Sequence, residues 1–136
     1  MIYLFLPFAL FISVIDLKEH RIPNYALVTL AGSTAIFRTL NEFKSINSPI
    51  ALLPLLLVLI FLWRWAGLGM GDVKFLIVIF AFVLLPDLET IESFTLALSA
   101  FLLLHLAIVA IGTRMLVSSL PLAPAISSAA LLTLLT

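Results

Sequence analysis

Two aspartates lie at the edges of strongly apolar stretches of the chain. Asp16 follows the apolar run Met1–Ile15, and Asp72 precedes the apolar run Val73–Leu85. When two carboxyl groups share one site, their repulsion raises the pKa of one of them, so that one carries a proton while the other acts as a base. If the helices that carry them are neighbours, Asp16 and Asp72 form a pair of the kind that activates water for hydrolysis.

Asp16 leads into a polar connection that ends in a signal for a new helix. The last residues of this connection are Arg21, Ile22, Pro23 and Asn24. Proline is tolerated in the first turn of a helix, because its missing N–H would have no partner there. The Ile-Pro-Asn sequence therefore predicts the start of the second helix.

Three glycines at every second position come directly before Asp72. Gly67, Gly69 and Gly71 remove side chains from this segment, which lets another backbone or a substrate approach closely. Asp72 is expected to begin its helix, where the helix dipole favours the ionised carboxylate, whereas Asp16 ends its helix and feels the opposite sign. This argument predicts that Asp72 ionises more readily and that Asp16 holds the proton.

Other polar residues near the aspartates have more than one interpretation. Lys74 lies two positions after the second aspartate and so on another face of the helix, which favours a phosphate contact or loop pairing over acid–base work. Glu19 and His20 could tune the first aspartate, although a solvated loop explains them more simply. His105, inside an apolar run, is either functional or a neutral imidazole bonded to a neighbouring helix.

The composition indicates a membrane protein. Of the 136 residues, 64% are hydrophobic and 10% are charged, whereas soluble domains average about 25% charged residues. Seven basic and seven acidic residues leave no net charge, so nothing points to a nucleic-acid partner. The sequence has no cysteine, which excludes disulfides, thiolate metal sites and cysteine nucleophiles.

Six uninterrupted apolar runs are expected to cross the membrane as helices, since a crossing takes about 20 helical residues. The runs are Met1–Ile15, Ile22–Phe37, Ile50–Trp63, Val73–Leu85, Ser93–Ile111 and Met115–Leu135. The alternation of apolar and polar residues typical of barrel strands is absent. The sequence thus predicts an all-α fold, a polytopic membrane helix bundle of about six transmembrane helices with short loops, in one domain over residues 1–136.

Basic residues set the expected orientation, because they favour the cytoplasmic ends of membrane helices. The first, third and fifth loops carry five of the seven basic residues, and the second and fourth carry only Arg38 and Lys44. The odd loops are therefore expected inside and both chain ends outside. Asp16 and Asp72 then lie on the cytoplasmic side, at or slightly below the inner membrane surface.

The motifs around the two aspartates closely resemble those of a known protease family. Asp-x-x-x-x-Arg-Ile-Pro-Asn, beginning at Asp16, and Gly-Met-Gly-Asp-Val-Lys-Phe, beginning at Gly69, are similar to the paired motifs of the type IV prepilin peptidases. Related archaeal preflagellin peptidases share the two-aspartate plan. The six apolar runs, the short loops and the late Pro121-Leu-Ala-Pro124 sequence also resemble the family, so the resemblance covers most of the chain.

The resemblance implies a membrane-embedded aspartic endopeptidase that cleaves the short basic leader from type IV pilin-like precursors at the cytoplasmic face of the bacterial inner membrane. Asp16 and Asp72 would be catalytic. The supporting or substrate-binding residues would be Arg21, Pro23, Asn24, Gly69, Gly71 and Lys74. The expected partners are precursors with a basic leader and an apolar helix, and the lipid bilayer; no metal, cofactor or nucleic acid is expected.

The chain departs from the larger members of the family, which carry an N-terminal region with paired cysteines and also methylate the new N-terminus. Here the first apolar run begins at residue 1 and cysteine is absent. No methyltransferase activity is therefore expected. The chain resembles the minimal, peptidase-only form that serves tight-adherence (Flp-type) pili.

Two other functions compete with this interpretation. Intramembrane proteases of the presenilin and signal-peptide-peptidase type also carry Gly-x-Gly-Asp, but they place tyrosine before the first aspartate, where this chain has Ile15. The alternative from a different class is a small non-enzymatic membrane subunit that conducts ions or protons or assists assembly. A conductor needs acidic groups along a path across the membrane, whereas Asp16 and Asp72 are expected at one face.

Overall fold

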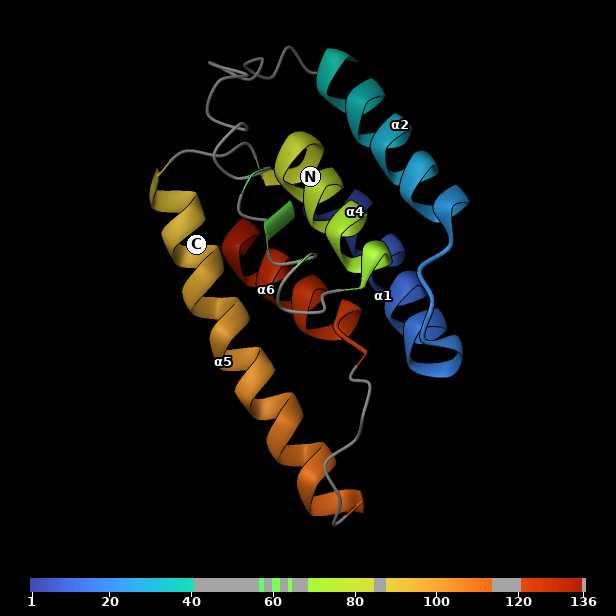
Figure 1. The fold of residues 1–136 in the computed structure, drawn as a ribbon. Helices are drawn as coiled ribbons and strands as arrows, with labels where there is room; N and C mark the ends of the chain where they lie inside the picture. The colour runs from blue at the N-terminus through green and yellow to red at the C-terminus, as the bar shows by residue number, and fades with distance from the viewer. Residues whose placement is uncertain are drawn as a thin grey trace.

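The computed structural model of the protein describes residues 1–40, 57, 60–61, 64, 69–84, 88–113 and 121–135, and every regular element within them is a helix (Figure 1). The helices are α1 (Ile2–Glu19), α2 (Asn24–Leu40), α4 (Met70–Val78) with its π-helical continuation η2 (Ile79–Leu84), α5 (Leu88–Thr113) and α6 (Ala123–Leu135). The predicted all-α fold is confirmed for this part of the chain.

One described helix has the length and apolar composition that a membrane crossing requires. In α5, residues Glu89–Ile108 have a mean hydropathy of 1.9, and the exposed side chains of α5 include Leu103 and Ile111. The six-crossing arrangement stays a prediction, and its third run, Ile50–Trp63, lies mostly outside the described residues. Lys44 and Arg114, which contribute to the orientation argument, also lie outside them.

The last predicted run, Met115–Leu135, is not one continuous helix. α6 begins at Ala123, and Pro121 and Leu122 before it are not helical. Proline is disfavoured in a helix interior, because its ring clashes with the carbonyl four residues earlier. The prediction is therefore wrong at these two positions, and residues 114–120 lie outside the described part of the chain.

α6 lies at the centre of the bundle, between α5 and α1 (Figure 1). α4 and η2 pack against α6 on one side and against α2 on the other. α2 also contacts α1. The helix nearest the C-terminus thus joins the first helix of the chain to the rest of the bundle.

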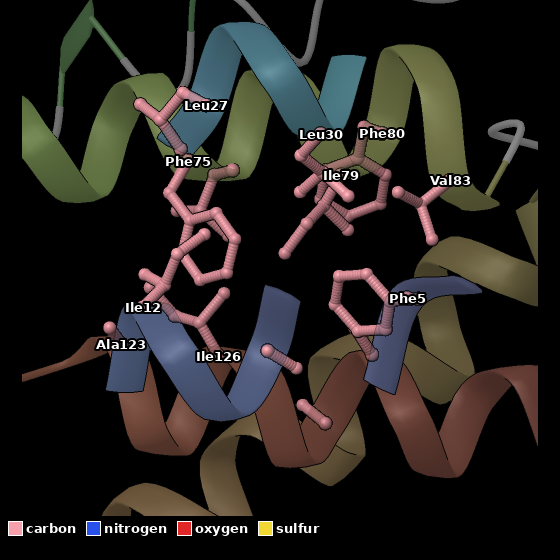
Figure 2. Packing of buried hydrophobic residues seen from close by; sticks show 14 of the residues in the cluster. Phe5, Ile12, Leu27, Leu30, Phe75, Ile79, Phe80, Val83, Ala123 and Ile126 are labelled. Atoms are coloured by element: carbon pink, nitrogen blue, oxygen red, sulfur yellow. The ribbon is translucent and has the colours of Figure 1, made fainter. Parts of the chain in front are cut away.

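Both aspartates extend the inner stripe of a helix. The buried residues of α1 lie at intervals of three or four, the spacing of one helix face: Phe5, Ala9, Ile12 and Asp16. On α4 and η2, buried residues follow Asp72 at a similar spacing: Phe75, Leu76, Ile79, Phe80 and Val83. Figure 2 shows the labelled side chains of α1 facing those of α4 and η2 across the core. The packing of these apolar side chains therefore turns both carboxyl groups toward the inside of the bundle.

α1 and α6 approach closely because α6 presents small side chains. Its buried residues are Ala123, Ala125, Ile126, Ser127, Ala129 and Ala130. Ser13 Oγ donates a hydrogen bond to Ser127 Oγ at 3.1 Å, and Ser127 Oγ donates to the Ala9 carbonyl at 3.5 Å. Small residues and hydroxyl hydrogen bonds are typical of helix interfaces within membranes. These contacts fix the position of α6 along α1.

Polar contacts tie α2 to the α4–η2 helix at both ends. Near the start of the two helices, Lys74 Nζ donates a hydrogen bond to Asn24 Oδ1 at 3.1 Å. Near their ends, Arg38 Nη2 donates to the Val83 carbonyl at 2.9 Å, and carbonyls in a last helical turn lack partners within their own helix. α2 and α4–η2 therefore run side by side in the same direction and are held together along their length.

Candidate functional site

A cavity of about 230 Å³ lies between the α1–α2 connection and the start of α4. The residues that line it from the first segment are Asp16, His20, Arg21 and Ile22, and those from the second are Gly69, Met70, Gly71 and Asp72. The cavity therefore brings together both predicted catalytic aspartates and three of the predicted supporting residues. The other three, Pro23, Asn24 and Lys74, are not among its lining residues.

Asp16 is held by the first turn of α6. Its side chain is 5% exposed, and its Oδ2 accepts a hydrogen bond from the backbone N–H of Ala123 at 3.0 Å. The first N–H groups of a helix have no partner within the helix, so a carboxylate oxygen at this point satisfies a donor that would otherwise be buried alone. Sequence reasoning missed this contact, because the two residues are 107 positions apart.

Asp72 lies in the first turn of α4, directly over the glycine at the helix N-cap. A Cβ atom built on Gly69 would stand only 2.7 Å from Asp72 Oδ2, closer than two such atoms approach in folded proteins. The carboxyl group therefore occupies the space that a side chain at position 69 would fill. Gly69 is needed for the position of the carboxyl group.

Gly71 allows a different close contact, between α4 and Ile22 of the α1–α2 connection. A Cβ atom on Gly71 would lie 3.3 Å from Ile22 Cβ and 3.5 Å from Ile22 N. The close backbone approach that the glycine pattern predicts is thus observed between α4 and the α1–α2 connection. A substrate-binding role for Gly69 and Gly71 stays a prediction, and Gly67 lies outside the described residues.

The two carboxyl groups act on each other electrostatically. Asp72 precedes the apolar run that begins at Val73, and burial raises the pKa of the Asp72 carboxyl to about 6, with a further rise caused by the negative charge of Asp16. Asp72 therefore keeps its proton to a higher pH than a free aspartate does.

The predicted location of the shared proton is wrong. The dipole of α4 was expected to keep Asp72 ionised, but burial outweighs it. Asp16 was expected to feel only the C-terminal end of α1, but its carboxylate also meets the N-terminal end of α6, where the dipole has the opposite sign. Burial thus opposes the ionisation of Asp72, and the Asp16 carboxyl group accepts a backbone hydrogen bond.

His20 closes α1 in a conformation that few residues adopt. Its backbone has φ 50° and ψ 36°, in the left-handed region, and its N–H donates a hydrogen bond to the Asp16 carbonyl at 2.9 Å. This geometry is a common helix ending, usually made by glycine, and histidine is among the residues that tolerate it. The sharp ending lets the chain turn back at once, so that His20 and Arg21, both exposed, line the cavity beside Asp16.

Pro23, Asn24 and Lys74 hold the scaffold around the cavity. The Pro23 carbonyl accepts a hydrogen bond from the Ala26 N–H at 3.1 Å and so begins α2, as its sequence predicts. Asn24 and Lys74 bond to each other, which matches the pairing interpretation of Lys74. These contacts fix the start of α2 against the start of α4.

His105 lies outside the cavity that holds the aspartates. It lines a second cavity between α5 and α6, together with Pro124 and Ser128 among others. Its Nε2 is buried and has no hydrogen-bond partner among the described residues. Neither of the two interpretations of His105 is decided by this placement.

One protein family matches the chain. The sequence model of the type IV leader peptidase family matches residues 3–113, which include α1, α2, α4, η2 and α5 and all eight residues that line the cavity. α6 follows the matched residues. No curated protein and no solved structure matches the chain.

The hydrogen bond between Asp16 and α6 predicts different stabilities for two substitutions. Asp16→Ala removes the acceptor of the Ala123 N–H, whereas Asp16→Asn keeps an oxygen that can accept it. We expect Asp16→Ala to be less stable than Asp16→Asn by about 1 kcal/mol, the usual effect of losing a helix cap. Thermal unfolding in detergent, followed by circular dichroism, measures the difference. Equal stability of the two variants would contradict a capping role.

Proposed function

The chain belongs to the type IV leader peptidase family, and on that premise we propose that it is a membrane-embedded aspartic endopeptidase with Asp16 and Asp72 as its catalytic pair. The family makes it a protease of the leader peptidase type that associates with membranes. The proposed substrates are type IV pilin-like precursors, cut between a short basic leader and an apolar helix at the cytoplasmic face of the bacterial inner membrane. The observation that carries the proposal is the cavity that both carboxyl groups line.

The proposed reaction uses the two carboxyl groups as base and acid. Asp16, kept as an acceptor by the Ala123 N–H, takes a proton from water, and the hydroxyl oxygen attacks the peptide carbonyl carbon. Asp72 gives its proton to the carbonyl oxygen as the tetrahedral intermediate forms. When the intermediate breaks down, the C–N bond is cleaved, the leaving amine takes the proton from Asp16, and Asp72 recovers a proton from the hydroxyl group. No bond forms between enzyme and substrate.

The outer faces of the bundle suit an apolar substrate helix in a bilayer. Large apolar side chains are exposed on several helices, including Val28 at 69% and Leu103 at 68%. Exposed apolar side chains on several helices fit contact with the acyl chains of a bilayer. In the proposal, the precursor's helix packs in the bilayer against the enzyme while the basic leader stays in the cytoplasm, which brings the junction between them to the cavity.

The non-enzymatic alternative fits the site less well. A conducting subunit needs ionisable groups spaced along a path through the membrane. Asp16 and Asp72 instead line a single cavity at one end of α1 and α4. This clustering favours hydrolysis over conduction.

Cleavage in cells tests the proposal directly. The chain is produced together with a prepilin, and the size of the prepilin is followed on a gel. We expect Asp16→Asn and Asp72→Asn each to lower cleavage by about 10²- to 10⁴-fold, the range for loss of a general acid or base. Glu92→Gln, which removes an exposed carboxylate on α5, is the matched control and should cleave normally. Mature product from both aspartate variants, at normal enzyme levels, would overturn the assignment.

The contact between Gly69 and Asp72 predicts a large effect of one methyl group. In Gly69→Ala, the added Cβ must push the Asp72 carboxyl out of its position, so we expect cleavage to fall at least about tenfold, since small displacements of reacting groups have effects of this size. Gly32→Ala is the control, because nothing lies within 4 Å of a Cβ at that position on α2. The measurement is the ratio of the initial cleavage rates of the two variants. Equal rates would contradict this role of Gly69.

The raised pKa of Asp72 predicts the pH dependence of cleavage. A carboxyl group with a pKa of about 6 is protonated below that pH and loses its proton as the pH rises through it. Since Asp72 is the proposed acid, we expect kcat/KM of the purified enzyme to fall as the pH rises through about 6. Rates measured between pH 5 and pH 8 test this. A rate that increases across this range would assign the acid role to another group.

A further inference from the structure

We propose that the backbone N–H of Ala123 is a positioning group of the peptidase, which holds the Asp16 carboxylate in the cavity as the base of the reaction. The inference rests on the proposed function and extends the active site to α6, a helix that follows the residues matched by the family. In this view α6 belongs to the catalytic machinery and is more than a packing element.

The contact between the two groups is sheltered from solvent. Ala123 is 0% exposed and Asp16 is 5% exposed, and the N–H to Oδ2 distance is 3.0 Å. A buried ionised carboxylate is strongly destabilised unless donors surround it, and a hydrogen bond to a charged group is about twice as strong as one between neutral groups. The Ala123 N–H therefore favours one orientation of the Asp16 carboxyl group.

The sequence around Ala123 prepares this donor. Pro121 precedes the helix, and Pro124 takes its second position, where the missing N–H has no consequence. The Ile126 N–H donates to the Leu122 carbonyl at 3.0 Å and closes the first turn. Two prolines with fixed φ values thus surround Ala123, and its N–H points along the helix axis toward Asp16, where the positive end of the helix dipole adds to the hydrogen bond.

α6 can hold the carboxylate in place because its own position is fixed. The bonds from Ser13 to Ser127 and from Ser127 to the Ala9 carbonyl join it to α1, the helix that carries Asp16. The distance between the donor and the carboxylate is therefore set within one pair of packed helices.

Few charged side chains near Asp16 could act on its carboxyl group in place of the Ala123 N–H. Residues 121–135 contain no titratable side chain, so α6 acts on Asp16 through its backbone. Two groups of titratable residues lie near Asp16. The first lines the cavity, and the second is exposed near the end of α1; they are Asp72, His20 and Arg21, and Lys18 and Glu19. All of them stay unchanged when the residue at position 123 is replaced.

Two substitutions at position 123 distinguish the role of the backbone N–H from the role of the Ala123 side chain in packing. Ala123→Pro removes the N–H at the first position of the helix, which accepts proline well. Ala123→Gly keeps the N–H and removes only a methyl group. For Ala123→Pro we expect kcat to fall by about 10- to 100-fold, the effect of losing a hydrogen bond to a charged group, with KM within about twofold of the wild-type value.

The Ala123→Gly variant should keep the wild-type kcat. Equal loss of kcat in both variants, or a wild-type kcat in Ala123→Pro, would show that α6 acts by packing alone and would overturn the proposal. If Ala123→Pro does not fold, an ester in place of the Leu122–Ala123 peptide bond removes the same N–H without a ring, and the same outcomes apply. Wild-type enzyme that cleaves no prepilin would instead refute the proposed function, so the two failures are distinguishable.

Discussion

A carboxylate placed on the inner face of an apolar helix must find a hydrogen-bond donor, and the arrangement of α1 and α6 follows from this constraint. Asp16 continues the buried stripe of α1, where an unpartnered charge would be strongly unfavourable. The donor comes from the backbone of Ala123. Small side chains on α6 allow the approach, and Ser127 fixes it through two hydrogen bonds to α1. These polar contacts and the small side chains together set how α6 packs against α1.

The second aspartate depends on space more than on donors. Asp72 folds back over Gly69, and any larger residue at the helix N-cap would collide with its carboxyl group. Two positions later, Gly71 lets Ile22 approach the start of α4. The alternating glycines thus serve two neighbours, one within the helix and one from the α1–α2 connection. Burial at this point also explains the raised pKa of Asp72.

The sequence was sufficient to predict the helical fold, the pairing of Asp16 with Asp72 and the close approach at the glycines. These features depend on local patterns: apolar runs, the glycine spacing and the Ile-Pro-Asn helix start. The start of α6 and the location of the proton were predicted wrongly. The start of α6 follows from the proline at position 121, and the raised pKa of Asp72 follows from burial in the folded bundle. The contact between Asp16 and Ala123 joins distant parts of the chain, and no local pattern indicates it. The second proline of the Pro121-Leu-Ala-Pro124 sequence was available as a signal for the helix start.

The links between α2 and α4–η2 have a consequence for how the catalytic pair assembles. The bonds from Lys74 to Asn24 and from Arg38 to Val83 join these helices into one pair, which carries Asp72. α1 and α6 form another, which carries Asp16. The short connection after α1, with His20 in its left-handed conformation, joins the two helix pairs. The two helix pairs share one apolar core, so the spacing of the two carboxyl groups follows from how the pairs pack against each other.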